Sequence, residues 1–344
     1  MKNHLKKIKR IFDYTDKSQY DYILNQSERS EKISNVMFEI FKQQLKQEDF
    51  MYYPNTKNFK EKICKFYNVK NENLFLSDGS DVGIKSVFET FTNRGKVITS
   101  EPSFPMYKVY SELYRCQYFG IHYDLDLLEL PVDSMLNFVD DETDLIILAN
   151  PNSPIGDSKT SEEIKLLLDT GKMVLIDEAY IEFSDNESMI QYIDEYPNLL
   201  VTRTFSKGFG AAGCRVGMTF GHKDTIELLS KFRQMYEITG VSMKYCDFLL
   251  NNYKLVDTYI REVREEKKRL VSMLKNYEVV DSNCNWIHFN NQDNNKKTKE
   301  ILDKHKVLVK YCKLHPYGFR DNWCRMTIQP NITRQDFIKE LVNG

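Results

Sequence analysis

The sequence predicts an α/β protein whose mostly parallel central sheet has helices on both faces, with a smaller α+β domain attached. Two patterns lead to this prediction. From about residue 73, short apolar runs rich in β-branched residues alternate with segments of helical periodicity, which is typical of strands buried on both faces of a parallel sheet. After about residue 255 a charged helix and a cluster of strand-like runs replace this alternation, which indicates a separate α+β unit.

The expected strands of the large unit are short and bounded by turn residues. They cover residues 73–77, 96–100, 144–149, 173–177, 199–203 and 215–220. Helical periodicity is expected between several of them, at 79–91, 105–115 and 161–170. Because parallel strands need long crossover connections, this alternation favours a parallel sheet.

The smaller unit is expected to begin after a charged helix at about 255–275. Its strand-like segments lie at 279–289, 306–310 and 323–328, and a closing helix is expected near 332–342. The Asn- and Lys-rich stretch 290–300 is interpreted as a solvated loop that leads into a helix. We therefore predict a large domain at 45–245 and a small domain made of 1–44 and 246–344.

Composition favours an enzyme that acts on small molecules. The 344 residues include 48 basic and 50 acidic side chains that are well mixed, so no large field of one sign is expected to attract nucleic acid or a membrane surface. No apolar run approaches the ~20 residues of a membrane-spanning helix, and the basic N-terminus is not followed by a signal-peptide pattern. The seven cysteines lack disulfide or metal-site spacing, which predicts a cytoplasmic protein without a bound metal.

The stretch LSDGSDVGIKS predicts a strand that turns directly into a helix. Gly79 permits the tight turn, and the backbone N–H groups of Ser80 and Asp81 then lie at the helix start. Free N–H groups and the helix dipole make such a position suitable for a phosphate. An ordinary helix cap is the alternative interpretation.

The stretch VLIDEAY ends an apolar strand with Asp177, and Tyr180 follows three residues later. A carboxylate at the end of a buried strand is costly unless a cation pairs with it. Asp177 therefore either caps a turn or pairs with a protonated ring nitrogen, such as the pyridinium of pyridoxal phosphate.

The stretch TRTFSKGFGAAGCR places Lys207 before a run of small residues. Close backbone packing there would desolvate the amine, as a lysine that forms a Schiff base with a carbonyl cofactor requires. Thr204, Ser206 and Arg215 offer hydroxyl and guanidinium contacts to a phosphate dianion. A surface turn is the alternative, but the Asp177 and Gly79 motifs together favour the cofactor site.

Five stretches, in this order along nearly the whole chain, resemble the fold type I aminotransferases of class I/II, and most closely the histidinol-phosphate aminotransferase branch. They are GSDxGI, EPSFPMY, NPNSPIG, IDEAYIEF and RTFSKGFGAAGCRVG. The resemblance implies pyridoxal 5'-phosphate as cofactor, with Lys207 as the Schiff-base lysine and proton shuttle. It also implies that Asp177 pairs with the pyridine nitrogen and that Tyr180 bonds to the phenolic oxygen.

The same resemblance implies the other contacts of the cofactor. Phe104 would stack on the ring, at a position often held by tyrosine. The phosphate would be bound by Ser80, Asp81, Thr204, Ser206 and Arg215. Tyr53 in MYYPN matches a tyrosine that reaches the phosphate of the partner subunit, which implies a homodimer.

The substrate side departs from the family pattern. Arg325 matches the arginine that holds a substrate carboxylate or phosphate, and Lys310 stands where a second arginine is usual. Ser153 replaces an asparagine that usually bonds to the phenolic oxygen, and Asn152 beside it is a candidate to compensate. Val82 replaces an acidic residue near the substrate, and Gln329-Pro330 replaces a common glycine beside Arg325.

The expected reaction moves an amino group from an amino acid, with glutamate as the expected donor, to a small keto substrate that carries phosphate. The alternative is decarboxylation of a phosphorylated amino acid such as phosphoserine or phosphothreonine, because Cys312 lies in a pattern shared with phospho-threonine decarboxylases; a buried apolar role for Cys312 is also open. A regulatory protein that binds the cofactor without turnover is disfavoured, because it does not need the proton shuttle Lys207 or the substrate arginine Arg325. A nicotinamide-dependent dehydrogenase is disfavoured because no expected strand is followed by GxGxxG.

Overall fold

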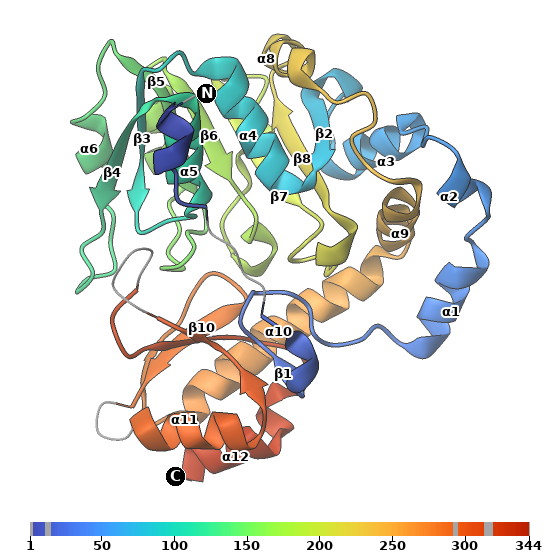
Figure 1. The fold of residues 1–344 in the computed structure, drawn as a ribbon, viewed down its shortest axis with the longest axis vertical. Coiled ribbons are helices and arrows are strands. Elements are labelled where there is room, and N and C mark those ends of the chain that lie inside the picture. Colours follow the sequence, from blue (N-terminus) through green and yellow to red (C-terminus); the bar gives the residue numbers. More distant parts are fainter. Residues whose placement is uncertain (1–2, 11–14, 292–294, 313–318, 344) are drawn as a thin grey trace.

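A computed structural model describes residues 3–10, 15–291, 295–312 and 319–343. Its largest element is a seven-stranded sheet in the order β2-β8-β7-β6-β5-β3-β4 (Figure 1). The strands are β2 (Leu74–Asp78), β3 (Lys96–Glu101), β4 (Gln117–His122), β5 (Thr143–Ala149), β6 (Met173–Asp177), β7 (Leu199–Thr204) and β8 (Val216–Gly221). Strands β4, β3, β5, β6 and β7 pair in parallel, whereas β8 is antiparallel to both β7 and β2.

The predicted α/β class with a mostly parallel sheet is confirmed, and the six predicted strands are present within a residue or two of their expected bounds. Strand β4 was not predicted. Ile121 is its only buried residue and the others are half-buried or exposed, as at a sheet edge, so it lacks the continuous buried run of a central strand. Residues 205–215 join β7 to β8 without an α-helix, whereas a parallel pair usually needs a longer helical crossover, so β8 pairs antiparallel to β7.

Helices cover both faces of the large sheet. Successive strand residues face opposite sides, so Leu145 packs into one hydrophobic cluster and Ile146 into another. One cluster includes side chains of α4 (Gly79–Phe91), α5 (Met106–Tyr114) and α8 (Lys223–Leu229). The other includes side chains of α3 (Lys57–Tyr67), α6 (Val132–Leu136), α7 (Ser161–Leu168) and α9 (Gly240–Asn251).

A smaller antiparallel sheet lies below the large one in Figure 1, in the order β12-β13-β10-β9. Its strands are β9 (Glu278–Val280), β10 (Trp286–Asn290), β12 (Lys310–Tyr311) and β13 (Cys324–Thr327). A separate pair joins β1 (Tyr22–Ile23) to β11 (Val307–Leu308) in parallel. The helices of this part are α10 (Tyr253–Met273), α11 (Asn295–Lys304) and α12 (Asp336–Asn343).

The smaller unit matches the predicted α+β content, with two refinements. The expected strands 279–289 and 306–310 are each divided in two, and the closing helix begins at Asp336 after a short 3₁₀ turn. In the expected loop 290–300, residues 292–294 lie outside the described residues, and α11 begins at Asn295.

The remaining helices α1 (Asn35–Gln43) and α2 (Glu48–Met51) precede the large sheet in the chain. One hydrophobic cluster runs from α3 and α9 through Val263 of α10 to Ile287 of β10, so the two units share a continuous core. The division at 44/45 and 245/246 therefore stays a prediction. No helix in the described ranges has the length and apolar character that crossing a bilayer requires.

Candidate active site

A cavity of about 420 Å³ lies at the carboxyl ends of the central strands of the large sheet, where open α/β sheets bind ligands. Ala149 ends β5, Asp177 ends β6 and Thr204 ends β7, and all three line it. Most of the predicted site residues also line it, namely Ser80, Asp81, Phe104, Ser153, Tyr180, Ser206, Lys207 and Arg215. The fold thus brings together residues that are far apart in the sequence.

One end of the cavity is built as an anion cradle. Helix α4 begins at Gly79, whose φ of +74° is unfavourable for residues with a side chain, and a Cβ at this position would collide with the guanidinium of Arg215. A Cβ on Gly217 of β8 would overlap the backbone of Gly79 and Ser80. The absence of both side chains lets the N-terminus of α4 and the Arg215 guanidinium approach the same point, as a phosphate requires.

The hydroxyl groups of β7 and the following loop complete this cradle. Thr204 Oγ1 donates to Ser206 Oγ at 3.0 Å and accepts from the Ser206 backbone N–H at 3.1 Å. Both residues are buried and line the cavity. On the other side, Asp81 of α4 accepts a hydrogen bond of 2.9 Å from the Tyr110 hydroxyl, so its side chain is held by α5 while its backbone N–H remains at the helix start.

Asp177 is buried, and its two oxygens have donors. The Tyr107 hydroxyl donates to one oxygen at 2.8 Å, and Thr202 Oγ1 donates to the other at 3.1 Å. Burial raises the pKa of Asp177 above its usual value, and the hydrogen bonds from Tyr107, Thr202 and the Ala179 backbone oppose that rise. A buried carboxylate in this position favours a cationic partner, such as a protonated ring nitrogen in the cavity.

Lys207 reaches the cavity from the loop that joins β7 to β8. Its Nζ donates to the backbone carbonyl of Gln26 at 2.8 Å and lies 5.4 Å from the centroid of the Tyr180 ring. Lys207 and Tyr180 therefore lie beside each other at the wall of the cavity, as a shared contact with one cofactor requires.

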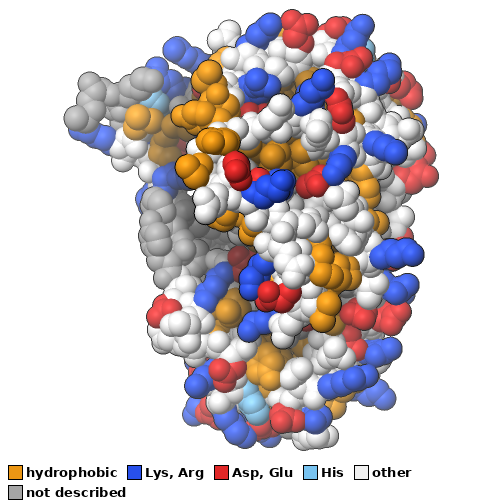
Figure 2. Space-filling model, turned by 90° about the vertical axis from the view of Figure 1, so that its right-hand side faces the viewer, with side chains coloured by type: hydrophobic (Ala, Val, Ile, Leu, Met, Phe, Trp, Pro, Cys, Tyr) orange, Lys and Arg blue, Asp and Glu red, His pale blue; other side chains and the backbone are white. Residues whose placement is uncertain are grey.

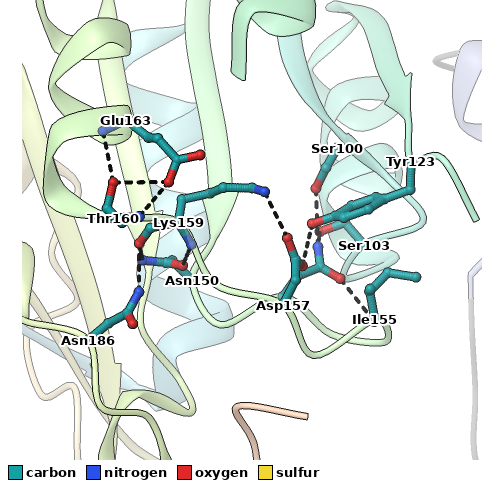
Figure 3. Close-up of polar contacts among 11 residues, drawn as sticks. Ser100, Ser103, Tyr123, Asn150, Ile155, Asp157, Lys159, Thr160, Glu163 and Asn186 are labelled. Carbon is teal, nitrogen blue, oxygen red and sulfur yellow. Dashed lines mark hydrogen bonds and ion pairs between the residues drawn. The ribbon is translucent and has the colours of Figure 1, made fainter. Parts of the chain in front are cut away.

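The loop that joins β5 to α7 is held by several hydrogen bonds (Figure 3). Ser153 belongs to this loop. Asn150 and Lys159 exchange two hydrogen bonds of 3.0 and 2.7 Å, and Asp157 accepts from the Tyr123 hydroxyl at 2.7 Å. A capping box between Thr160 and Glu163 then begins α7. The loop is thus anchored on both sides of Ser153, which lines the cavity.

Asn152 does not join the cavity. Its side-chain amide is buried and donates to Ser100 Oγ and Ser103 Oγ, both at 3.2 Å, while its oxygen accepts from the Ile155 N–H at 3.1 Å. The side-chain amide of Asn152 therefore stabilises the loop through these hydrogen bonds. In this arrangement the Asn152 side chain does not point into the cavity, so it does not take the place of the asparagine that Ser153 replaces.

Arg325 of β13 is not among the described residues that line the cavity, but it contacts Ser153, which does line it. Its Nη1 is 3.4 Å from Ser153 Oγ and its Nη2 is 3.4 Å from the Asn25 carbonyl. Its guanidinium carbon lies 4.9 Å from the centroid of the Trp286 ring. Lys310 is exposed and directly opposite Arg325 in the pairing of β12 with β13.

Tyr53 is not part of this cavity in a single chain. Its side chain is 76% exposed and stacks on Tyr236 at 4.0 Å between ring centroids. Within the described residues, no group of three or more His, Cys, Asp and Glu side chains is placed to hold a metal ion.

The structure adds four residues that sequence reasoning missed. Gln26 and Glu28 line the cavity from the N-terminal segment, and Tyr107 and Thr202 hold Asp177. Thr202 is directly opposite Asp177 in the β6–β7 register, so pairing of the two predicted strand ends could have revealed it. Tyr107 lies inside the quoted EPSFPMY stretch, but nothing in the sequence alone links its hydroxyl to Asp177.

Comparison with known proteins is consistent with this geometry. The family described as aminotransferase class I and II matches residues 19–343. A histidinol-phosphate aminotransferase of Christiangramia forsetii is 31% identical over 262 residues, which are 74% of this chain and 75% of that protein. One of Flavobacterium johnsoniae is 30% identical over 295 residues, covering 84% of this chain and 83% of the relative.

Solved structures show the same fold. Histidinol-phosphate aminotransferase from Sinorhizobium meliloti, in complex with pyridoxal-5'-phosphate, has a TM-score of 0.84 at 17% identity and covers 99% of this chain and 95% of its own. L-threonine-O-3-phosphate decarboxylase from Porphyromonas gingivalis has a TM-score of 0.77 at 19% identity, with 94% and 98% covered.

The chain therefore belongs to the class I and II aminotransferase family. It is an enzyme of the fold type I architecture, similar to the histidinol-phosphate aminotransferases, and the prediction of pyridoxal 5'-phosphate as its cofactor is confirmed. The residues present fit this group, because the glycine-lined cradle suits a phosphate and buried Asp177 suits a pyridinium nitrogen.

Proposed function

We propose that the protein transfers an amino group from an amino acid, with glutamate as the donor, to a small keto substrate that carries phosphate. The observation that carries the proposal is the contact of Arg325 with Ser153 of the cavity wall, at 3.4 Å from Nη1 to Oγ, in a guanidinium without a carboxylate partner among the described residues. A guanidinium in this state favours an anionic substrate group.

In this proposal each side chain has a separate task. Pyridoxal phosphate, when bound, supplies the electron sink that withdraws charge from the substrate's α-carbon. Asp177 keeps a proton on the ring nitrogen through its negative charge, and Tyr107 and Thr202 hold that carboxylate in place. Lys207 Nζ takes a proton from one carbon and returns it to another, which is general acid–base catalysis by a positioned amine.

The donor half of the reaction tests the proposal directly. Mixing the cofactor-loaded protein with glutamate should convert the cofactor to its amine form, which is followed by absorbance, and a phosphorylated keto compound should reverse the change. Replacing the Arg325 side chain by Ala should lower kcat/KM by an amount worth roughly 2–5 kcal/mol, as for a lost buried charged contact. The proposal would be contradicted if neither glutamate nor any other amino acid changed the absorbance of the bound cofactor.

A second candidate is decarboxylation of a phosphorylated amino acid. It is supported by the fold shared with a threonine-phosphate decarboxylase and by Cys312, which lies next to the Arg325 strand and donates its N–H to the Trp323 carbonyl at 2.7 Å. Burial raises the pKa of the Cys312 thiol to about 11, so the thiol is neutral at pH 7 and fits an apolar packing role. Release of carbon dioxide from phosphoserine or phosphothreonine, with no need of an amino acceptor, would favour this candidate over transamination.

We propose that the active unit is a homodimer in which Tyr53 reaches the partner's cofactor phosphate. The face that carries α1 and α2 exposes large apolar side chains in several groups (Figure 2). They include Val36, Phe50, Met51, Tyr53 and Met235, with between 68% and 81% of each side chain exposed. An apolar surface of this kind is typical of a contact between proteins.

Light scattering after gel filtration tests the dimer, which should have twice the chain mass of 40.7 kDa. Changing Phe50 and Met235 together to Lys should give monomers with weakened cofactor binding, whereas Leu228→Lys, at an exposed site on α8, should not. A wild-type monomer would contradict the proposal. A cytoplasmic location is also proposed, since all seven cysteines are free thiols, as is usual in a reducing compartment.

A further inference from the structure

The carboxylate of Asp157 connects the loop between β5 and α7 to the large sheet (Figure 3). Tyr123, which directly follows β4, donates its hydroxyl to one Asp157 oxygen at 2.7 Å. The other oxygen forms an ion pair of 3.2 Å with Lys159 Nζ. Tyr123 is buried, and only 17% of the Asp157 side chain and 11% of the Lys159 side chain are exposed. A buried carboxylate is costly without such partners, so the three groups hold one another in place.

The Tyr123 hydroxyl is a donor throughout the pH range of interest. Burial and the nearby charge of Asp157 raise the pKa of Tyr123 well above 10. Burial raises the pKa of Asp157 as well, whereas the hydrogen bond from Tyr123 and the charge of Lys159 oppose that rise. The bond between Tyr123 and Asp157 is therefore a fixed attachment point for the loop.

Asp157 ends a short turn that contains Ser153. The Asn152 N–H donates to the Asp157 carbonyl at 2.9 Å, and the Gly156 N–H donates to the Asn152 carbonyl at 2.9 Å. These two bonds close residues 152–157 into one turn, so a displacement of Asp157 displaces the Ser153 backbone as well. The carboxylate of Asp157 therefore fixes the end of this turn on the large sheet.

Backbone position matters more for Ser153 than for the asparagine that it replaces. The serine hydroxyl is bonded directly to Cβ, whereas an asparagine amide nitrogen lies one bond further out, so the backbone sets the reach of the hydroxyl. Ser153 lines the cofactor cavity, and its Oγ lies 3.4 Å from Arg325 Nη1. A hydrogen bond from a hydroxyl is best at about 2.7–2.8 Å between heavy atoms, and a misplacement of a fraction of an ångström weakens it.

We propose that Asp157 is a positioning residue. Held by Tyr123 and Lys159, it places the Ser153 hydroxyl at hydrogen-bond distance from the phenolic oxygen of the bound cofactor. Asp157 is not among the described residues that line the cavity, so it acts through the turn and not by contact. This role needs the contact expected between Ser153 and the cofactor, but it does not depend on which substrate is bound.

The test is a pH titration of the absorbance of the cofactor-loaded protein, without any amino acid. This absorbance changes as the nitrogen that joins the cofactor to Lys207 loses its proton. A hydrogen bond from Ser153 to the phenolic oxygen favours the deprotonated form, because the negative charge on that oxygen then has no positive charge beside it. Ser153→Ala should therefore raise the midpoint of the titration by about one unit, the change expected for one hydrogen bond.

Tyr123→Phe should raise the midpoint by part of that amount, because it keeps the ring and deletes only the bond to Asp157. In the Ser153→Ala background, Tyr123→Phe should not change the midpoint further, since no hydroxyl remains to be positioned. A role limited to folding stability would lower the melting temperature of Tyr123→Phe and leave its midpoint at the wild-type value.

Two comparisons complete the design. Asp157→Asn keeps an oxygen that accepts from Tyr123, so its midpoint should be closer to the wild-type value than that of Asp157→Ala. Tyr22→Phe is the matched control, because it also deletes a tyrosine hydroxyl bond of 2.8 Å, in this case to Gln335 before α12, and it should leave the midpoint unchanged. If Tyr123→Phe does not fold, Asp157→Asn replaces it in both backgrounds.

An unchanged midpoint in Tyr123→Phe or in Ser153→Ala would overturn the inference. An equal shift from Tyr123→Phe in both backgrounds would also overturn it, because Asp157 would then not act through Ser153. The outcome is independent of the amino-transfer test. If the midpoints follow the expected pattern but no amino acid changes the absorbance, the transaminase proposal fails and the positioning role stands. If glutamate converts the cofactor but Tyr123→Phe leaves the midpoint unchanged, the positioning role fails and the proposed function stands.

Discussion

Removing one hydroxyl group, by Tyr107→Phe, should weaken the electronic effect of Asp177 on the cofactor. The Tyr107 side chain is fully buried, and its hydroxyl donates to an Asp177 oxygen at 2.8 Å. Burial next to Asp177 raises the pKa of Tyr107 well above 10, so the hydroxyl keeps its proton and remains a donor at every pH of interest. The substitution keeps the ring and deletes only this hydrogen bond.

The size of the effect follows from the charge on the acceptor. A hydrogen bond to an ionised group is worth about 1.5–3 kcal/mol. Its loss therefore raises the pKa of Asp177 further and favours transfer of the ring-nitrogen proton to the carboxylate by the same free energy. Amino transfer should therefore slow by roughly 10- to 100-fold in kcat, with a smaller change in KM.

Single-turnover absorbance with glutamate measures this rate without the second substrate. Tyr110→Phe is the matched control, because Tyr110 lies on the same helix and donates to the carboxylate of Asp81 at 2.9 Å. It should change the rate by far less, since the proposed contact of Asp81 with the cofactor phosphate is made by its backbone N–H and not by its carboxylate. A wild-type rate in Tyr107→Phe, or an equal loss in both variants, would refute the role assigned to Tyr107.

Three further predictions concern the cofactor site. Lys207→Ala should abolish turnover and the absorbance of the covalently bound cofactor while the protein still binds the cofactor at Asp177 and the cradle; substantial residual turnover would disprove the role of this lysine. Asp177→Asn should raise the melting temperature of the cofactor-free protein at pH 7. Burial raises the pKa of Asp177 in the folded state, so the ionised carboxylate lowers the stability of the wild type at pH values above that pKa. The higher melting temperature of the variant should disappear as the pH falls below the pKa values of Asp177 in the folded and unfolded states. Gly217→Ala should lower cofactor affinity at least tenfold, because its Cβ would overlap the backbone of Gly79 and Ser80, whereas Gly213→Ala, whose Cβ would meet nothing within 4 Å, should bind normally in the same equilibrium titration.

The strands that sequence reasoning located are those with continuous apolar runs. β5 and β6 bury almost every residue, so their composition alone marks them, whereas β4 at the sheet edge buries only one. The order of the strands and the reversal of β8 depend on which hydrophobic faces meet, and this information is distributed over the whole chain.

The site was predictable where function requires a special residue type at a special local position. Lys207, Asp177 and the Gly79 turn are of this kind, because the chemistry and the backbone geometry both restrict the choice. Tyr107 and Gln26 were not predictable, since one acts through a common hydroxyl on a helix and the other through a backbone carbonyl that any residue offers. Asn152 was expected in the cavity because it is next to Ser153 in the sequence, but its side-chain amide bonds to Ser100 and Ser103 instead.

The antiparallel pairing of β7 with β8 has a consequence for folding. The loop between them carries Lys207, and β8 begins just after Arg215, so the lysine and the arginine that we propose to hold the cofactor belong to one hairpin that needs only local chain closure. Asp177 on β6 and Ser80 on α4 join that hairpin through contacts between more distant parts of the chain. A refolding chain should therefore assemble the lysine and its arginine early, and acquire tight cofactor binding only when β2 and β6 dock on either side of the hairpin.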